Sequence, residues 1–288
     1  MTLIIILIAI AVEQFAGVAA ELRQLTWFEN YTHWLENKIG HQNIWNGAFG
    51  VIITLAGPLL VLVLMLTLMD SVSLLFSFLL SLIILIYSFG HNCLNNELDE
   101  YTSALEEEDT VEINRLESEL FQSGDEDDGE QQFIETVFVK TNERLFGVVL
   151  WFLLLGPLGA LLYRLTIKLR DQQTDIHGSY ADSARDLCNI LNWLPARLLA
   201  LGNALSGNLV DAIDAWRESE HESLLVNEEV IKSSGLGALQ YRPGISAIDD
   251  SITNERLYWM QALQGLLNRT LFIWLTIVGV ISIAGWIG

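Results

Sequence analysis

Two pairs of polar residues stand in otherwise apolar stretches of this sequence, where they could bind an anion. Tyr163 and Arg164 follow a long apolar segment and offer a hydroxyl donor and a fixed positive charge. Asn192 and Arg197 flank a proline, and a kink there could turn both side chains into one polar pocket. The forked guanidinium of arginine suits a phosphate or a carboxylate. Plainer alternatives stay open: Arg164 reaches the membrane surface beside a helix-packing motif, and Arg197 pairs with Glu13 or with a carboxylate of a loop.

The composition indicates that these residues belong to a membrane protein. Of the 288 residues, 51% are hydrophobic and only 18% are charged, against about 25% charged in soluble domains. The mean hydropathy is +0.37. These values exclude a single water-soluble globule. With 15 basic and 36 acidic residues, the chain carries a net charge of −21 and lacks the basic surface that nucleic-acid binding needs. Two distant cysteines and five dispersed histidines show no metal-binding spacing.

Four apolar stretches of about 19 residues are long enough to cross a bilayer as helices. They are residues 51–69, 71–87, 145–163 and 270–288. Asp70 is the only charge between the first two, which predicts a helical hairpin with Asp70 in its turn. Arg164, Lys168 and Arg170 follow the third stretch and favour the cytoplasmic side for that end. If all four helices span, the acidic segment before the third one lies outside.

Two further segments are less apolar. Residues 1–20 contain Glu13, which is expected at the interface or in a polar cavity of the bundle, and no basic residue that would mark a signal peptide. Residues 190–205 contain Pro195 and Arg197, which favours a re-entrant or interfacial element over a plain span.

The remaining polar segments divide the chain. Residues 92–144 hold 17 acidic and 3 basic residues, which predicts a solvated loop, with a mobile tip near Ser123, Gly124 and Gly129. Strand patterns are nearly absent, so we predict an all-α polytopic transmembrane bundle with four long spanning helices and shorter re-entrant or interfacial ones. Five regions are expected: 1–90, the N-terminal membrane segment and hairpin; 91–144, the acidic loop; 145–207, the third helix and the polar-pocket motifs; 208–269, an amphipathic soluble segment; and 270–288, the C-terminal helix.

The soluble segment carries its own helical pattern. Leu209, Ile213 and Trp216 recur at the spacing of one helix face. Further on, Gly235 and Gly237 resemble a phosphate loop only superficially, because the lysine and hydroxyl that complete such a loop are missing. A helix C-cap or a tight turn is expected at these glycines.

Two motifs carry a resemblance to known proteins. They read Asn142-Glu143-Arg144-Leu145-Phe146, followed by Leu155-Gly156-Pro157-Leu158-Gly159 and Tyr163-Arg164, and then Asn192-Trp193-Leu194-Pro195-Ala196-Arg197. With them the chain resembles the AmpE family, inner-membrane proteins tied to β-lactamase induction, and through it the CobD/CbiB amide synthases of cobalamin biosynthesis. The resemblance covers nearly the whole chain and is sharpest over residues 135–201.

The chain also departs from the synthase pattern. The synthases follow their Tyr-Arg pair with an Asn and an Asp, where this chain has Ile167 and Arg170. They also place two Asp residues before the second motif, where this chain has Cys188 and Asn189. Carboxylates are the hard ligands that magnesium needs when it activates a nucleotide. Their loss weighs against synthase catalysis but leaves the scaffold and an anion pocket.

Three functions therefore stand at this stage. The first is a multi-pass bacterial inner-membrane regulator of the AmpE kind, not an enzyme, which binds an anionic or nucleotide ligand and a signalling partner protein. The alternative is an ATP-dependent amide synthase, with ATP and magnesium, that joins an amino-alcohol phosphate to a corrinoid carboxylate. The third is partner recruitment by the acidic loop alone. The expected ligand-binding residues are Asp109, Asn142, Tyr163, Arg164, Asn192 and Arg197.

Overall fold

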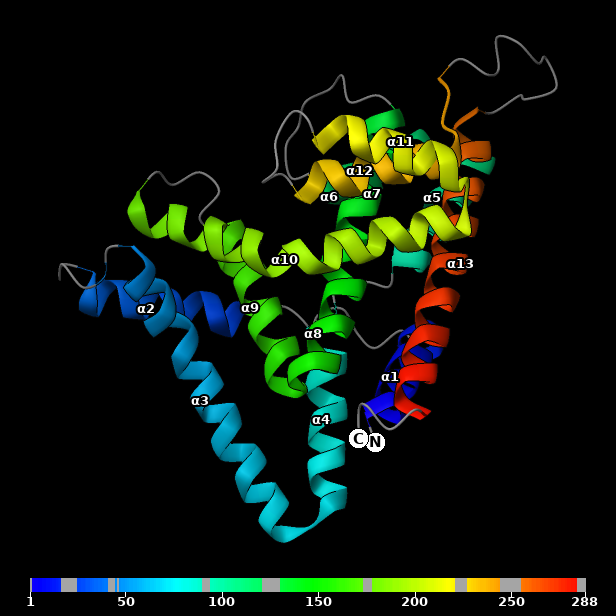
Figure 1. The fold of residues 1–288 in the computed structure, drawn as a ribbon. Coiled ribbons are helices and arrows are strands. Elements are labelled where there is room, and N and C mark those ends of the chain that lie inside the picture. Colours follow the sequence, from blue (N-terminus) through cyan, green and yellow to red (C-terminus); the bar gives the residue numbers. More distant parts are fainter. Residues whose placement is uncertain are drawn as a thin grey trace. The chain divides into compact units, whose positions relative to one another are not determined.

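The structure, a computed structural model, is built from helices (Figure 1). It describes residues 2–16, 25–40, 45, 47–89, 94–120, 130–172, 178–220, 227–243 and 255–283. These ranges contain no strand, which confirms the all-α prediction. The chain divides into two compact units: a first unit of residues 1–91, 143–194 and 285–288, and a second unit of residues 92–142 and 195–284.

The helices of the first unit are α1 (Thr2–Ala16), α2 (Thr26–Ile39), α3 (Ala48–Val72), α4 (Leu74–Ser88), α8 (Gly147–Leu155), α9 (Pro157–Gln172) and the first part of α10 (Ser179–Ser206). Those of the second unit are α5 (Leu94–Glu106), α6 (Thr110–Leu120), α7 (Glu130–Thr141), the rest of α10, α11 (Leu209–Glu220), α12 (Asn227–Leu239) and α13 (Glu255–Ile283). A π-helical turn, Asn142–Phe146, follows α7.

The prediction of four long spanning helices is wrong in part. Within the described ranges, two helices are long and apolar enough to cross a membrane, Ala48–Ser71 in α3 and Glu255–Ile281 in α13. The second predicted span forms only the 15 residues of α4, a length of about 22 Å. Extended backbone at Ser73, whose hydroxyl accepts a hydrogen bond from the Leu75 amide, separates α4 from α3. Asp70 therefore lies in the last turns of α3, and the turn follows at Ser73.

The third predicted span is broken into a hairpin. Gly156 ends α8 with a φ of 66°, a conformation that favours glycine, and Pro157 begins α9. The two helices then run back along each other, as the segment between the π-turn and α10 shows in Figure 1. Residues 145–163 therefore reverse direction at Gly156 rather than forming one helix. The expectation that they span, which placed the acidic segment outside, loses its basis.

The core of the first unit lies where α2, α3, α9 and α10 meet. Apolar side chains at helical spacing on α9, such as Leu161, Leu165 and Leu169, are buried against Val51 and Leu55 of α3. Burying each such side chain stabilises the fold by roughly 1.5–3 kcal/mol. This packing fixes α9, and with it the polar side chains on its other faces.

The described residues of the acidic segment, which was predicted to be a solvated loop, are mostly helical, and the predicted mobile tip lies outside the described residues. In α5, Leu98, Tyr101 and Leu105 form a buried face, and the Tyr101 ring stacks on Phe133 of α7 with centroids 4.4 Å apart. The acidic side chains occupy the remaining faces, which explains why charge counting alone suggested a loop. Residues 121–129, with most of the acidic run 125–130, lie outside the described residues.

The predicted amphipathic helix is confirmed as α11, which packs on α12. The turn or C-cap expected at Gly235 and Gly237 is wrong, because both glycines lie inside α12. A Cβ at Gly235 would come within 2.5 Å of the Phe138 ring, and one at Gly237 within 2.5 Å of the Asp211 carbonyl oxygen. The glycines therefore allow α7 and α11 to approach α12 closely.

Candidate functional site

The structure brings Tyr163 and Asn192 together in the first unit. Tyr163 is buried, and its hydroxyl donates a hydrogen bond of 2.6 Å to Asn192 Oδ1. Asn192 Nδ2 donates to Cys188 Sγ, one turn earlier in α10, at 3.3 Å. Gly147 of α8 makes room for this arrangement, because a Cβ there would overlap the Tyr163 ring and hydroxyl. The Tyr163 and Asn192 motifs are therefore in direct contact.

Arg170 connects the same site to two carboxylates. Its Nη1 lies 2.5 Å from Glu143 Oε1, and its Nε and Nη2 donate to Asp171 Oδ1 at 3.0 and 2.7 Å. Nη1 also lies 3.7 Å from Cys188 Sγ. The Glu143 side chain is only 5% exposed and that of Arg170 20%. We call this set the hairpin polar cluster; its members are Glu143, Tyr163, Arg170, Asp171, Cys188 and Asn192.

Burial and charge set the protonation states in the cluster. Burial raises the pKa of the Cys188 thiol to about 12, although the neighbouring Arg170 acts in the opposite direction. Burial alone would lower the pKa of Arg170, but the Glu143 carboxylate holds it above its ordinary value. Near neutral pH the cluster therefore contains a neutral thiol and a charged guanidinium.

A magnesium ion bound by the chain does not fit this site. The two carboxylates of the hairpin polar cluster, those of Glu143 and Asp171, are both bound by Arg170. Ile167 is buried and apolar, and Cys188 keeps its proton. Across the described ranges, no group of three or more His, Cys, Asp or Glu side chains is arranged to hold a metal. The guanidinium of Arg170 supplies the positive charge beside Glu143 and Asp171.

Three other predicted ligand residues, Asp109, Asn142 and Arg197, lie in the second unit, whereas Arg164 lies on α9 of the first. Asn142 is 1% exposed within the π-helical turn. Arg197 Nη1 donates to Asn227 Oδ1 at 2.9 Å. Asp109 Oδ1 accepts from two backbone amides at the start of α6, at 3.0 and 3.2 Å, which is the geometry of a helix N-cap. A ligand pocket shared by these residues with Tyr163 and Asn192 stays a prediction.

Sequence reasoning missed the part played by Glu143 and Asp171, and it treated Arg170 only as a departure from a pattern. One signal was available: Tyr163, Ile167 and Arg170 recur at the spacing of a single helix face. The sequence did not predict that the chain reverses direction at Gly156, and this reversal is what brings Glu143 next to that face.

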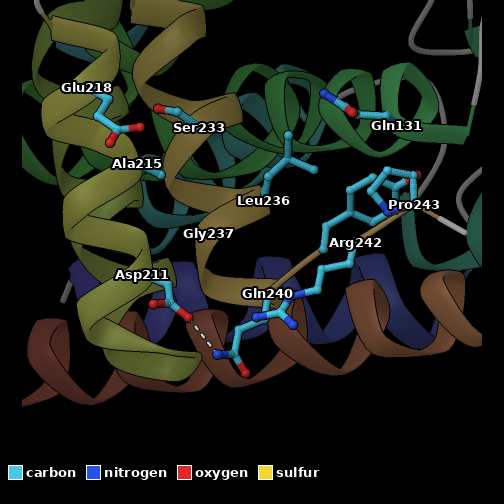
Figure 2. Close-up of a pocket in the computed structure, with 11 residues that line it drawn as sticks. Gln131, Asp211, Ala215, Glu218, Ser233, Leu236, Gly237, Gln240, Arg242 and Pro243 are labelled. Atoms are coloured by element: carbon cyan, nitrogen blue, oxygen red, sulfur yellow. Dashed lines mark hydrogen bonds between the residues drawn. The ribbon is translucent and has the colours of Figure 1, made fainter. Parts of the chain in front are cut away.

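The second unit contains a separate open cavity of about 520 Å³ (Figure 2). Asp211 and Glu218 of α11 line one side, and the Asp211 carboxylate accepts a hydrogen bond of 2.5 Å from Gln240. Tyr241 lines it too, and burial together with the charge of Glu130 raises the pKa of Tyr241 to about 12. Two carboxylates and the guanidinium of Arg242 therefore line this cavity. None of the predicted ligand residues lines it.

Comparisons with known proteins place the chain in a family. The family model described as CobD/Cbib protein matches residues 6–244, so the chain belongs to the CobD/CbiB family. The chain is 33% identical over 111 residues to the cobalamin biosynthesis protein CobD of Chromobacterium violaceum, covering 37% of this chain and 35% of that protein. It is 32% identical over 120 residues to the CobD of Stutzerimonas stutzeri, covering 40% and 39%. The alignments thus span little more than a third of either relative. No solved structure matches.

These findings correct the leading functional hypothesis. The matching family and both curated relatives point to cobalamin biosynthesis, and neither relative is an AmpE protein. The interpretation as a regulator of β-lactamase induction is therefore wrong, and the resemblance to CobD/CbiB is the part of the comparison that is confirmed.

Proposed function

We propose that this chain is a membrane enzyme of cobalamin biosynthesis that forms an amide bond between a corrinoid carboxylate and an amino-alcohol phosphate. The observation that carries the proposal is the family match over residues 6–244, which includes the α8–α9 hairpin and all of α10. The curated relatives, named for cobalamin biosynthesis, support the pathway. Amide formation releases the elements of water, and cleavage of a phosphoanhydride of ATP takes them up.

The hairpin polar cluster has a positioning role in this proposal. Its donors and acceptors bind one another, as Tyr163 with Asn192 and Arg170 with Glu143 show. Such a network fixes the faces of α9 and the first part of α10. Phosphate binding falls to arginines outside the cluster, and Arg197 is our candidate in the second unit. No step is assigned to a metal held by the chain.

The test is product formation by the purified full-length chain. A corrinoid acid, an amino-alcohol phosphate, magnesium and ATP are supplied in detergent, and products are read by mass spectrometry. We expect a species with the summed mass of corrinoid and amine less one water, formed only when ATP is present. Absence of this species, in an assay where the Chromobacterium violaceum CobD protein makes it, would refute the proposal.

A pair of variants tests the part assigned to Arg197. Arg197→Ala removes the guanidinium and also the partner of the buried Asn227, so it costs stability as well. Asn227→Ala breaks the same bond but keeps the charge. We expect ATP binding, measured by isothermal titration, to be lost in Arg197→Ala and kept in Asn227→Ala. Equal loss in both variants would mean that Arg197 acts only through the fold.

A further inference from the structure

An apolar groove runs along α3 in the first unit. It has a volume of about 380 Å³ and almost no polar lining. Gly57, Val61 and Met65 form one wall, at a spacing of four residues on a single face of α3. From Gly57 to Met65 this wall extends over about 12 Å, at 1.5 Å per residue. Ile84 of α4 and Leu161 of α9 also line the groove.

The groove lies on a helix that is suited to the bilayer. α3 contains a 24-residue candidate span, and its side chains Val61 and Met65 are 55% and 50% exposed. Trp27 and Tyr31 of α2 lie at the groove as well, and a Cβ at Gly57 would overlap the Tyr31 hydroxyl. Tryptophan and tyrosine are the residues that proteins place at the level of lipid headgroups. The groove therefore combines an apolar channel with an aromatic end.

The next turn beyond the groove walls is polar on two helices. Tyr87 follows Ile84 by three residues on α4, and Arg164 follows Leu161 by three residues on α9, so each lies on the same face as its wall residue. Tyr87 is tied to the groove directly, since its hydroxyl accepts a hydrogen bond of 2.5 Å from Trp27 Nε1. The charge of Arg164 acts on the Tyr87 hydroxyl. A polar layer thus follows the apolar channel.

Positive charge gathers in this layer. Arg164 Nε is buried and has no hydrogen-bond acceptor among the described residues. Arg144 is near enough for its like charge to act on Arg164. The carboxylates of Glu143 and Asp171 also act on Arg164, but both are bound by Arg170. An anion at Arg164 would satisfy the Nε donor and offset the repulsion from Arg144.

We propose that this groove binds an anionic phospholipid, with an acyl chain along Gly57, Val61 and Met65 and the phosphate at Arg164. The apolar lining suits a hydrocarbon chain, and charge complementarity at the polar layer selects an anionic headgroup. This site does not depend on the proposed enzymatic function, because its ligand is a component of the membrane.

Native mass spectrometry of the delipidated full chain tests the proposal. The protein is titrated in detergent with phosphatidylglycerol and with phosphatidylcholine of the same acyl chains. We expect phosphatidylglycerol to bind about tenfold more tightly, since only its headgroup carries a net negative charge for Arg164. Equal binding of the two lipids would overturn the proposal. Displacement of phosphatidylglycerol by an equal concentration of inorganic phosphate would also overturn it, because the acyl chain would then add nothing to the affinity.

Matched variants distinguish the contribution of the acyl chain to lipid binding from that of the headgroup. Val61→Trp fills the groove and should abolish tight binding, whereas Leu64→Trp, on an exposed side chain of the same helix that does not line the groove, should not. Arg164→Gln should remove the preference for phosphatidylglycerol, and Arg164→Lys should keep it. This pair of results would show that the preference depends on the positive charge at position 164 and not on a folding defect. Arg185→Gln is the surface control. Binding by Val61→Trp equal to that of the wild type would refute the site.

Discussion

Replacement of Arg170 by methionine should destabilise the protein strongly, because it removes the guanidinium that is paired with the buried Glu143 carboxylate. The Glu143 side chain is 5% exposed and lies 2.5 Å from the guanidinium. Breaking a buried ion pair from one side costs about 3–5 kcal/mol. Arg170 is 20% exposed and Asp171 24%, so water reduces the loss, and we expect about 3 kcal/mol. At 2–4 °C per kcal/mol, the melting temperature should fall by about 6–12 °C.

The reasoning is tested by a cycle of variants, followed by the loss of helical circular dichroism on heating in detergent. Glu143→Gln should cost only about 1 kcal/mol, because Arg170 keeps Asp171 as a partner. The double variant Arg170→Met with Glu143→Gln should be more stable than Arg170→Met alone by about 2 kcal/mol. As control, Arg185→Met breaks an exposed pair with Asp182 and should change stability by less than about 0.5 kcal/mol. A double variant no more stable than Arg170→Met would refute the argument.

Three further outcomes are expected. In a Cys93→Ser background, iodoacetamide at pH 8 should leave Cys188 unmodified in the folded protein and label it in denaturant, because burial keeps the thiol protonated; equal labelling would contradict this. Burial and the charge of Glu255 raise the pKa of Glu130 from its ordinary 4.5 to about 7, so the folded state holds this proton more tightly and stability falls as pH rises from 4.5 to 7. Glu130→Gln should flatten that fall, by about 1 kcal/mol after screening at a half-buried side chain, and an unchanged pH profile would refute the assignment. Gly147→Ala should displace the Tyr163 ring and lower the melting temperature by several degrees, whereas an unchanged value would show that the ring moves without cost.

The sequence predicted helices well where apolar spacing is regular and failed where a single residue reverses the chain. α3 follows directly from its long uncharged apolar run, and α11 from apolar residues at helical spacing. Residues 145–163 have the composition of a span, and nothing in hydropathy distinguishes a long helix from two shorter ones joined at Gly156. Acidic content likewise hid α5, since its buried Leu98 and Tyr101 are few beside the exposed carboxylates.

The candidate site was predictable in its motifs and not in its partners. Tyr163 and Asn192 were singled out by type and position, and they do form a hydrogen bond. Glu143 lies 27 residues from Arg170 in the sequence, and only the reversal brings the two side chains together. A pair of this kind depends on tertiary geometry, which local spacing does not contain.

The reversal at Gly156 has a consequence for counting membrane crossings. The ion pair between Glu143 and Arg170 joins the π-helical turn that precedes α8 to the last turn of α9, so both ends of this hairpin lie at one level of the first unit. A hairpin whose two ends lie on the same side of a membrane does not cross it, so it contributes no crossing to the topology. Reporter domains inserted at either end would therefore give the same sidedness signal. A hydropathy count that scores residues 145–163 as one crossing therefore differs by one crossing from a count that follows the hairpin.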